Sequence, residues 1–235
     1  MVKQLSESQA ILDTARRVYF HSAPRTWFPR SNKFPPLYDE FASIMSRMPH
    51  LIESRLHGIG DLPASLVDFV IHNKTLELLT LSDVTILPPA FHRQISPLSY
   101  RGIQAARVTG DIIGPLFSNS SSTLQRLEIG LQFPMQAISF LSHSPTNRMS
   151  SLVELNIWKS LTEEQASWFV RLLSCCPVLE QLSIYGKFPF PMSLVPVRAL
   201  PRLRSLVADD DGHALVLLNS PIRHISALTL TFKDP

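Results

Sequence analysis

The sequence has little charge, little glycine and almost no cysteine. Only 17% of its 235 residues are charged, below the usual quarter, whereas 45% are hydrophobic. Low charge with this much apolar side chain argues against a disordered chain. Eight glycines stand against nineteen prolines, which predicts many short, punctuated elements rather than a few long ones.

Export and membrane signals are absent as well. Two cysteines cannot build a disulfide framework, and the N-terminus MVKQLSESQAILDTARR lacks the apolar core of a signal peptide. No stretch approaches the ~18–20 apolar residues that a membrane span needs. The net charge of +3 is mild, and the 22 Lys and Arg form no basic run. We therefore expect an intracellular protein, cytoplasmic or nuclear, with neither nucleic acid nor membrane as a partner.

Catalytic and cofactor motifs are missing too. There is no G-x-S-x-G, no G-x-G-x-x-G or phosphate-binding loop, and no H-x-x-x-H or H-E-x-x-H. Nothing in the sequence assembles a nucleophile, a base and an oxyanion hole. We expect a protein that is not an enzyme, with no catalytic residues, no cofactor and no metal site.

The run Asp209-Asp210-Asp211-Gly212 has two interpretations. One is a metal site, although consecutive carboxylates alternate in direction and a calcium loop needs spaced oxygens with a bidentate Glu. The other is a helix N-cap whose negative charge favours the helix dipole. The second is simpler, and we expect it here.

The string L-x-x-L-x-L, with Ile, Val or Ala allowed, recurs along the chain. Clear copies begin at Leu76, Leu124, Leu152, Leu179, Leu203 and Ile225, and weaker copies begin at Leu51 and Ile103. Successive copies start 21 to 28 residues apart, about 25 on average, which is the period of leucine-rich repeats. The spacing predicts one α/β leucine-rich-repeat solenoid over residues 1–235, a ribonuclease-inhibitor-like arc with parallel inner strands and outer helices.

Helix-sized segments separate these strand motifs. The clearest is Thr162–Cys176, where Thr162 and Gln165 form a capping box and Pro177 ends the helix. Shorter helices are expected at Ala64–Ile71, Asp111–Phe117, Met135–Leu141 and Gly212–Leu218. A helical lead-in is expected from about Ser6 to Val18, with a Ser6–Gln9 capping pair and an apolar stripe of Ile11, Leu12, Ala15 and Val18.

Such units must stack to be stable. One repeat buries too little apolar surface to offset the entropy lost when about 25 residues become ordered. Neighbours must therefore share their apolar faces. We expect Leu79, Leu127, Leu155 and Leu182 to form a single buried row.

The adjacent Cys175 and Cys176 have a chemical and a packing interpretation. A disulfide between neighbours is poor geometry, because their Cα atoms are about 3.8 Å apart. No His lies at zinc-like spacing, and a reactive thiolate favours a helix N-terminus rather than the C-terminus expected here. We expect both cysteines to pack as small hydrophobic residues.

The stretch LLSCCPVLEQLSI carries a family resemblance. It resembles the Leu-Leu-x-x-Cys-Pro-x-Leu-Glu-x-Leu-x-Ile pattern of the leucine-rich regions of plant and fungal F-box proteins, matched at Leu172, Leu173, Cys176, Pro177, Leu179, Glu180, Leu182 and Ile184. Ala15-Arg16-Arg17-Val18 with Tyr19-Phe20 is similar to the stretch that opens the repeat region in fungal members. Met48-Pro49-His50-Leu51 and Leu200-Pro201-Arg202-Leu203 resemble their recurring Pro-x-Leu segment before a strand. The resemblance implies the substrate-recognition region of a cullin-type ubiquitin-ligase receptor.

The F-box itself is not found. Only Asp61–Val67, with its Leu62-Pro63, approaches the F-box start, and it lacks the acidic residue and the later Cys, Arg and Trp. We expect it to form a repeat helix instead. The chain ends at Pro235 directly after a strand, without a polar capping repeat, so we expect either that it is part of a longer protein or that a partner covers its last face. A cullin-ligase adaptor is then a partner only if an F-box lies outside this chain.

Period-two alternation turns the residues between the leucines toward the concave face. With the first Leu numbered n, positions n+2, n+4 and n+6 are exposed: from Leu51 these are Glu53, Arg55 and His57, and from Ile103 they are Ala105, Arg107 and Thr109. We expect the protein-binding surface to comprise Arg107, Arg126, Glu128, Glu154, Asn156, Trp158, Gln181, Ser183, Tyr185 and Asp209.

Trp158 and Tyr185 share a column in consecutive repeats. Exposed aromatics ringed by polar groups are common anchors of protein interfaces. Alternatively, both rings cover strand ends or pack under a loop. The leading functional hypothesis is a non-catalytic protein-binding module within an F-box-like ubiquitin-ligase receptor, and the competing one is a stand-alone scaffold without a link to ubiquitin.

Overall fold

In the part of the chain that the structure describes, short strands follow one another, and helices separate some of them. The computed structural model describes residues 8–21, 35–85, 100–109, 116, 119–130, 148–158, 160–186, 200–208 and 227–230. The described helices are α2 (Gln9–Thr14), α3 (Pro35–Ser46), α4 (Ala64–His72) and α7 (Glu163–Ser174). The strands are β1 (Arg17–His21), β2 (Glu53–Asp61), β3 (Leu78–Thr85), β4 (Gly102–Thr109), β5 (Arg126–Ile129), β6 (Glu154–Ile157), β7 (Gln181–Ile184), β8 (Ser205–Ala208) and β9 (Ala227–Leu230).

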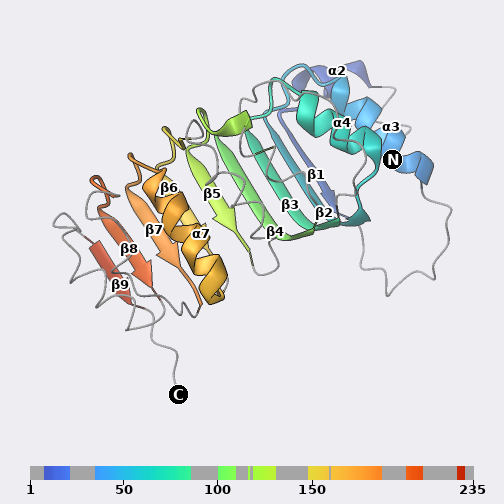
Figure 1. Cartoon of the computed structure of the whole chain (residues 1–235). Coiled ribbons are helices and arrows are strands. Elements are labelled where there is room, and N and C mark those ends of the chain that lie inside the picture. Colours follow the sequence, from blue (N-terminus) through green and yellow to red (C-terminus); the bar gives the residue numbers. More distant parts are fainter. Residues whose placement is uncertain are drawn as a thin grey trace.

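The nine strands of the described residues all belong to one sheet, and their order in the sheet is their order in the chain. Every neighbouring pair is parallel, from β1–β2 to β8–β9. Parallel neighbours need a crossover that returns the chain to the same end of the sheet. The result is an open α/β sheet with β1 and β9 at its two edges (Figure 1).

One hydrogen-bond pattern repeats at the start of each strand from β2 to β8. Two consecutive N–H groups donate to one carbonyl of the preceding unit, as Glu77 and Leu78 do to Ile52 at 2.9 and 3.0 Å. The same pair of bonds runs from Arg101 and Gly102 to Glu77, and it recurs as far as β8 with distances of 2.7 to 3.1 Å. Each unit therefore begins its strand with the same backbone geometry.

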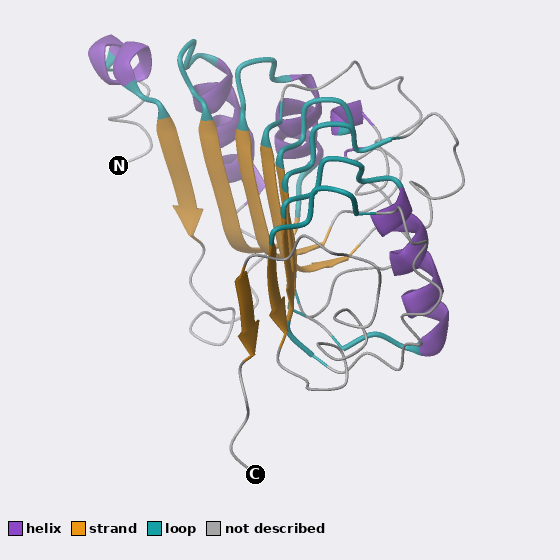
Figure 2. Ribbon diagram, turned by 90° about the vertical axis from the view of Figure 1, so that its left-hand side faces the viewer, coloured by secondary structure: helices purple, strands orange, loops and turns teal. Residues whose placement is uncertain are grey.

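The expected buried row is present. Strand pairing aligns Leu79 with Ile103, then with Leu127, Leu155 and Leu182, and each of these side chains is at most 2% exposed. These residues belong to one hydrophobic core that runs along the described sheet. Figure 2 shows α3, α4 and α7 on one side of the strands, so the core lies between the sheet and these helices.

The helix between β6 and β7 follows the sequence prediction closely. Thr162 accepts a hydrogen bond from the backbone N–H of Gln165, whose side chain accepts one from the Thr162 N–H. This capping box begins α7 at Glu163, and Phe169 and Leu173 on its inner side are fully buried. The predicted helix at Ala64–Ile71 also forms, as α4.

The predicted N-terminal helix is only partly right. It ends at Thr14, its N-cap is Ser8 rather than Ser6, and Val18 lies in strand β1. Ile11, assigned to the buried stripe, is 44% exposed, whereas Leu12 is fully buried. Beta-branched and aromatic residues in RVYFH favour a strand, and this segment pairs in parallel with β2 from Arg17 to His21.

The third copy of the repeat, predicted to begin at Ile103, begins three residues earlier in the structure. Pairing aligns Ile103 with Leu79 and Leu127, so the position equivalent to Leu76 is Tyr100, not Ile103. Tyr100 is fully buried and donates a hydrogen bond from its hydroxyl to the Val70 carbonyl at 2.8 Å. A tyrosine with a partner for its hydroxyl thus occupies a leucine position, which the L-x-x-L-x-L pattern does not recognise.

Other expectations fall largely or wholly outside the described residues. The predicted helices Met135–Leu141 and Gly212–Leu218 lie there, as does Asp111–Phe117 except for Leu116, which is buried.

In the described ranges, no helix combines the length and apolarity that would carry it across a membrane.

Candidate functional site

The sheet surface opposite α3, α4 and α7 carries mainly polar side chains, and we call it the open face (Figure 2). Strand register arranges its residues in rows that cross the strands. The first row contains Arg17, Glu53, Leu78, Gly102, Arg126, Glu154, Gln181 and Ser205. The second contains Tyr19, Arg55, Thr80, Gln104, Glu128, Asn156, Ser183 and Val207.

Polar side chains in the middle of the open face bind one another across the strands. Gln104 donates from Nε2 to Oε1 of Glu128 at 2.8 Å, and Thr80 donates to Oε1 of Gln104 at 3.4 Å. Arg126 contacts Oε2 of Glu154 at 2.6 Å, and Asn156 donates to Oε1 of the same carboxylate at 2.8 Å. These contacts connect the predicted site residues Arg126, Glu154 and Asn156 to one another, and Glu128 to Gln104.

Trp158 and Tyr185 form a stacked pair at the end of β6 and β7. Their ring centroids are 3.8 Å apart and their planes differ by 7°. The backbone N–H groups of Trp158 and Tyr185 donate to Ile129 and Ile157, so both residues continue the ladder beyond the strand ends. Trp158 remains 42% exposed although Tyr185 covers one of its faces. Such a rigid, partly exposed aromatic surface is suited to contact a partner.

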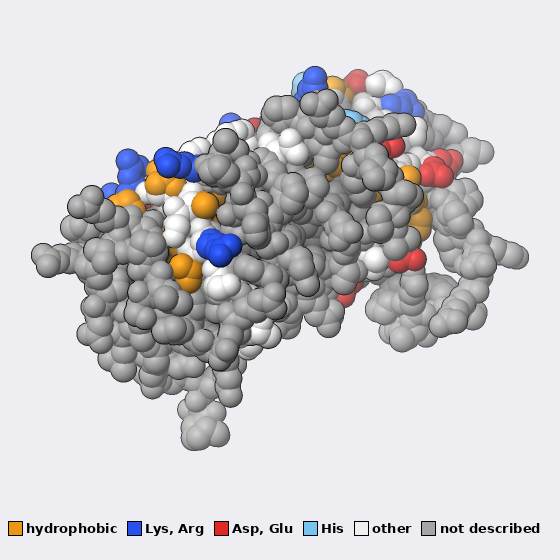
Figure 3. Space-filling model, in the orientation of Figure 1, with side chains coloured by type: hydrophobic (Ala, Val, Ile, Leu, Met, Phe, Trp, Pro, Cys, Tyr) orange, Lys and Arg blue, Asp and Glu red, His pale blue; other side chains and the backbone are white. Residues whose placement is uncertain are grey.

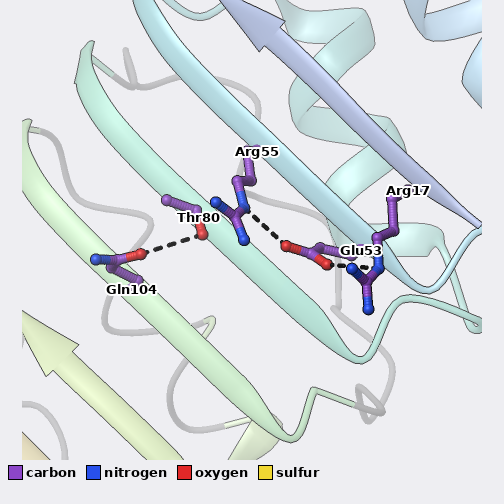
Figure 4. Close-up of polar contacts among 5 residues, drawn as sticks. All are labelled: Arg17, Glu53, Arg55, Thr80 and Gln104. Carbon is purple, nitrogen blue, oxygen red and sulfur yellow. Dashed lines mark hydrogen bonds and ion pairs between the residues drawn. The ribbon is translucent and has the colours of Figure 1, made fainter.

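At the other end of the open face, Glu53 lies between two arginines (Figure 4). Arg17 contacts Oε2 of Glu53 through Nε at 3.2 Å, and Arg55 donates from Nε to Oε1 at 2.7 Å. Glu53 was expected to be exposed, but it is only 4% exposed, because the two arginine side chains and the neighbouring strands cover it. We call these three residues the Arg17–Glu53–Arg55 triad.

Aromatic groups support this end of the face. The Arg55 guanidinium lies 4.7 Å from the ring centroid of Tyr19, a cation–π contact. The hydrogen bond to Glu53 raises the pKa of Arg55, against a smaller opposing effect of desolvation. Further along the same strands, His21 and His57 stack with centroids 4.5 Å apart, and His57 lies 3.8 Å from Asp83.

The structure brings most of the predicted binding residues together on one face. Gln181 and Ser183 join Glu154 and Asn156 there, in the register that pairs β6 with β7. Arg107 was counted from the misplaced repeat, and the register places Gln104, not Arg107, beside Glu128. The Arg107 side chain and all of Asp209 lie outside the described residues.

Sequence reasoning missed Arg17, Tyr19 and Gln104 as surface residues. Arg17 and Tyr19 were hidden because their segment was assigned partly to a helix. Ala15-x-x-Val18-x-Phe20 fits the repeat string only if Phe is also allowed at its last position. Gln104 was hidden because the third repeat was predicted to begin at Ile103 instead of Tyr100. A start at Tyr100 makes the neighbouring spacings 24 and 24 residues instead of 27 and 21, and this regularity was the available signal.

The two cysteines have the surroundings of packed side chains. Cys176 is fully buried, and its thiol donates to the Leu172 carbonyl at 3.1 Å. Burial raises the pKa of both thiols, more strongly for Cys176, so each is a weaker nucleophile at neutral pH than a free cysteine. Within the described residues no group of three or more His, Cys, Asp or Glu could hold a metal ion.

The helix side offers a different surface. A hollow of about 650 Å³ lies between α3 and α4 and is lined by residues such as Asp39, Ser65 and His72. Most of the described acidic side chains visible from this side lie toward the α3–α4 end (Figure 3). This hollow contains none of the predicted binding residues.

No model of a known protein family matches the chain, and no curated protein matches it either. Arguments about function therefore rest on the chain's own residues and their arrangement.

Proposed function

We propose that this chain is a leucine-rich-repeat solenoid whose open face binds a protein target without catalysing a reaction. The repeated backbone geometry supports this proposal, because stacked repeats place equivalent residues of successive units in rows. The parallel sheet with strands in chain order and the continuous row of buried leucines also support it. Solenoids of this kind use one extended face for binding, since helices occupy the other.

The single observation that carries the binding role is the stacked pair Trp158 and Tyr185. Large rigid aromatics contribute most of the energy at protein interfaces when polar groups surround them. Here Asn156 and Ser183 lie two residues away on the same face, and Glu154 and Gln181 lie two residues further. A pre-stacked pair loses little side-chain entropy on binding.

The target is a substrate protein of a cullin-type ubiquitin ligase, and the chain is the recognition region of an F-box-like receptor. This more specific proposal is supported by the resemblance at Cys176-Pro177 and the surrounding leucines. The Leu62-Pro63 segment leads into α4, which packs on the sheet like a repeat helix. Adaptor binding is therefore proposed only for a product that carries an F-box elsewhere.

The binding role is tested by comparing proteins captured in cells by the wild type and by the double variant Trp158→Ala/Tyr185→Ala. The matched control is Ile11→Ala, which removes another exposed apolar side chain, in helix α2 rather than on the open face. We expect a target that is retained by wild type and control and lost by the double variant. Equal capture by all three proteins would contradict a role for the aromatic pair.

The ubiquitin link needs a separate experiment. The full-length gene product is purified from its native cells and probed for a cullin adaptor. Co-purification of the adaptor is expected. Its absence, together with target binding that depends on Trp158, would favour a stand-alone scaffold over a ligase receptor.

A further inference from the structure

The Arg17–Glu53–Arg55 triad contains two positively charged side chains and one carboxylate. Both arginine side chains are more than half exposed, at 63% and 54%, whereas the Glu53 side chain is only 6% exposed. The negative charge is therefore covered and the positive charges face solvent. Elsewhere on the described open face, Arg126 pairs with the single carboxylate of Glu154, and this pair has no net positive charge.

Both guanidinium groups contact the Glu53 carboxylate. Arg17 and Arg55 each use Nε toward a different oxygen of Glu53, and Tyr19 supports Arg55 from β1. A guanidinium has five N–H donors, so one bond to Glu53 leaves donors for a second acceptor. The Nη edge of each arginine is suited to bind an oxyanion with two parallel hydrogen bonds.

We propose that the Arg17–Glu53–Arg55 triad binds a carboxylate side chain, Asp or Glu, of the protein segment that occupies the open face. The triad has a net charge of +1, from two arginines and one glutamate, and one carboxylate neutralises it. A phosphate with nearly two negative charges would leave an excess beside Glu53. Charge complementarity therefore favours a carboxylate over a phosphoryl group.

The neighbouring residues give the bound segment a mixed character. Leu78 pairs with Glu53 in the register of β2 and β3 and is 41% exposed. An acidic side chain on the triad would have an apolar contact beside it. This inference rests on the proposed function, since it specifies one residue type in the partner of the same face. The triad lies on β1 and β2, whereas Trp158 follows β6.

The test is a nuclear magnetic resonance titration of the whole chain, labelled with nitrogen-15 at arginine. The probes are three capped tripeptides: Gly-Glu-Gly, Gly-Gln-Gly and Gly-phosphoserine-Gly. The Nε–H resonances of Arg17 and Arg55 are assigned with the variants Arg17→Lys and Arg55→Lys, and Arg126 serves as the internal reference. We expect the glutamate peptide to shift Arg17 and Arg55 saturably, with an affinity at least about fivefold higher than at Arg126.

Variants then separate the site from general attraction. Arg55→Gln should weaken binding about fivefold or more, read at Arg17, whereas Arg126→Gln should leave it within about twofold. Equal shifts with the glutamine peptide, or equal affinities at all three arginines, would overturn the proposal. Tighter binding of the phosphoserine peptide, by about tenfold, would replace the carboxylate by a phosphoryl group.

This result is independent of the aromatic pair. The Trp158→Ala/Tyr185→Ala variant should bind the glutamate peptide as the wild type does, because neither ring contacts the triad. If target capture proves insensitive to the aromatic pair while the peptide still binds the triad, the proposed function fails and the carboxylate site stands. If the glutamate peptide does not bind the triad while target capture depends on Trp158, only the proposal of a carboxylate site is rejected.

Discussion

Leu78 and Leu79 are adjacent in the chain and lie on opposite faces of the sheet. Leu79 is 1% exposed and belongs to the buried row, whereas Leu78 is 41% exposed on the open face. Both residues belong to β3, where side chains alternate between the two faces. β3 thus carries one leucine in the core and a second leucine that is exposed to solvent.

This pair gives the sharpest test of the fold. We expect Leu79→Ala to lower the free energy of unfolding by about 2–5 kcal/mol, because it leaves a cavity in the core. Leu78→Ala should change it by no more than about 0.5 kcal/mol, since the side chain is largely solvated. Chemical denaturation of both variants measures the difference. Similar losses for the two would show that the strand does not separate its faces as described.

Ser54 is a polar residue in the row otherwise filled by apolar side chains. It pairs with Val18 and Leu79, is fully buried, and its hydroxyl has no hydrogen-bond partner among the described residues. A buried hydroxyl without a partner costs about 1–3 kcal/mol in desolvation. We therefore expect Ser54→Ala to stabilise the protein by about 1 kcal/mol.

The measurement is again chemical denaturation, with Ser183→Ala on the open face as control. Ser183 is partly exposed, and removing its hydroxyl should be nearly neutral. A destabilised Ser54→Ala protein would mean that the hydroxyl has a partner in the folded chain.

Much of the fold was predictable from the sequence because leucine spacing reports strand position directly. The row from Leu79 to Leu182 and the capping box of Thr162 and Gln165 both follow from local pattern. The pattern failed where another residue type fills a leucine position. At Tyr100 a hydrogen bond to Val70 makes a buried tyrosine acceptable, and this bond depends on α4, which lies far away in the sequence.

The candidate site was predictable only in part, for a related reason. Alternation correctly turns Trp158 and Tyr185 to the same face, and the structure adds that they stack. Burial of Glu53 could not be predicted, because it depends on Arg17 in a strand that lies 36 residues earlier in the chain. Long-range pairing of this kind leaves no local periodic signal.

The capping box of α7 gives a further prediction. Replacing Thr162 with Val keeps the shape of the side chain but removes the oxygen that accepts the Gln165 N–H. We expect a loss of about 1 kcal/mol in the free energy of unfolding, whereas Thr162→Ser should retain most of the stability. Denaturation curves of the two variants provide the comparison. Equal stability of the two would show that the cap contributes nothing measurable.

The cysteines give a prediction about reactivity and pH. Burial raises the pKa of both thiols, and it raises that of Cys176 more, while Arg148 partly counteracts the shift at Cys175. A raised pKa means less thiolate at a given pH, and the thiolate is the form that reacts with iodoacetamide. We expect Cys175 to be alkylated more slowly than free cysteine at pH 8, and Cys176 to react only after unfolding. Mass spectrometry after timed alkylation, with and without denaturant, measures both rates. If Cys176 is modified in the folded protein as fast as Cys175, its environment is not the closed core described here.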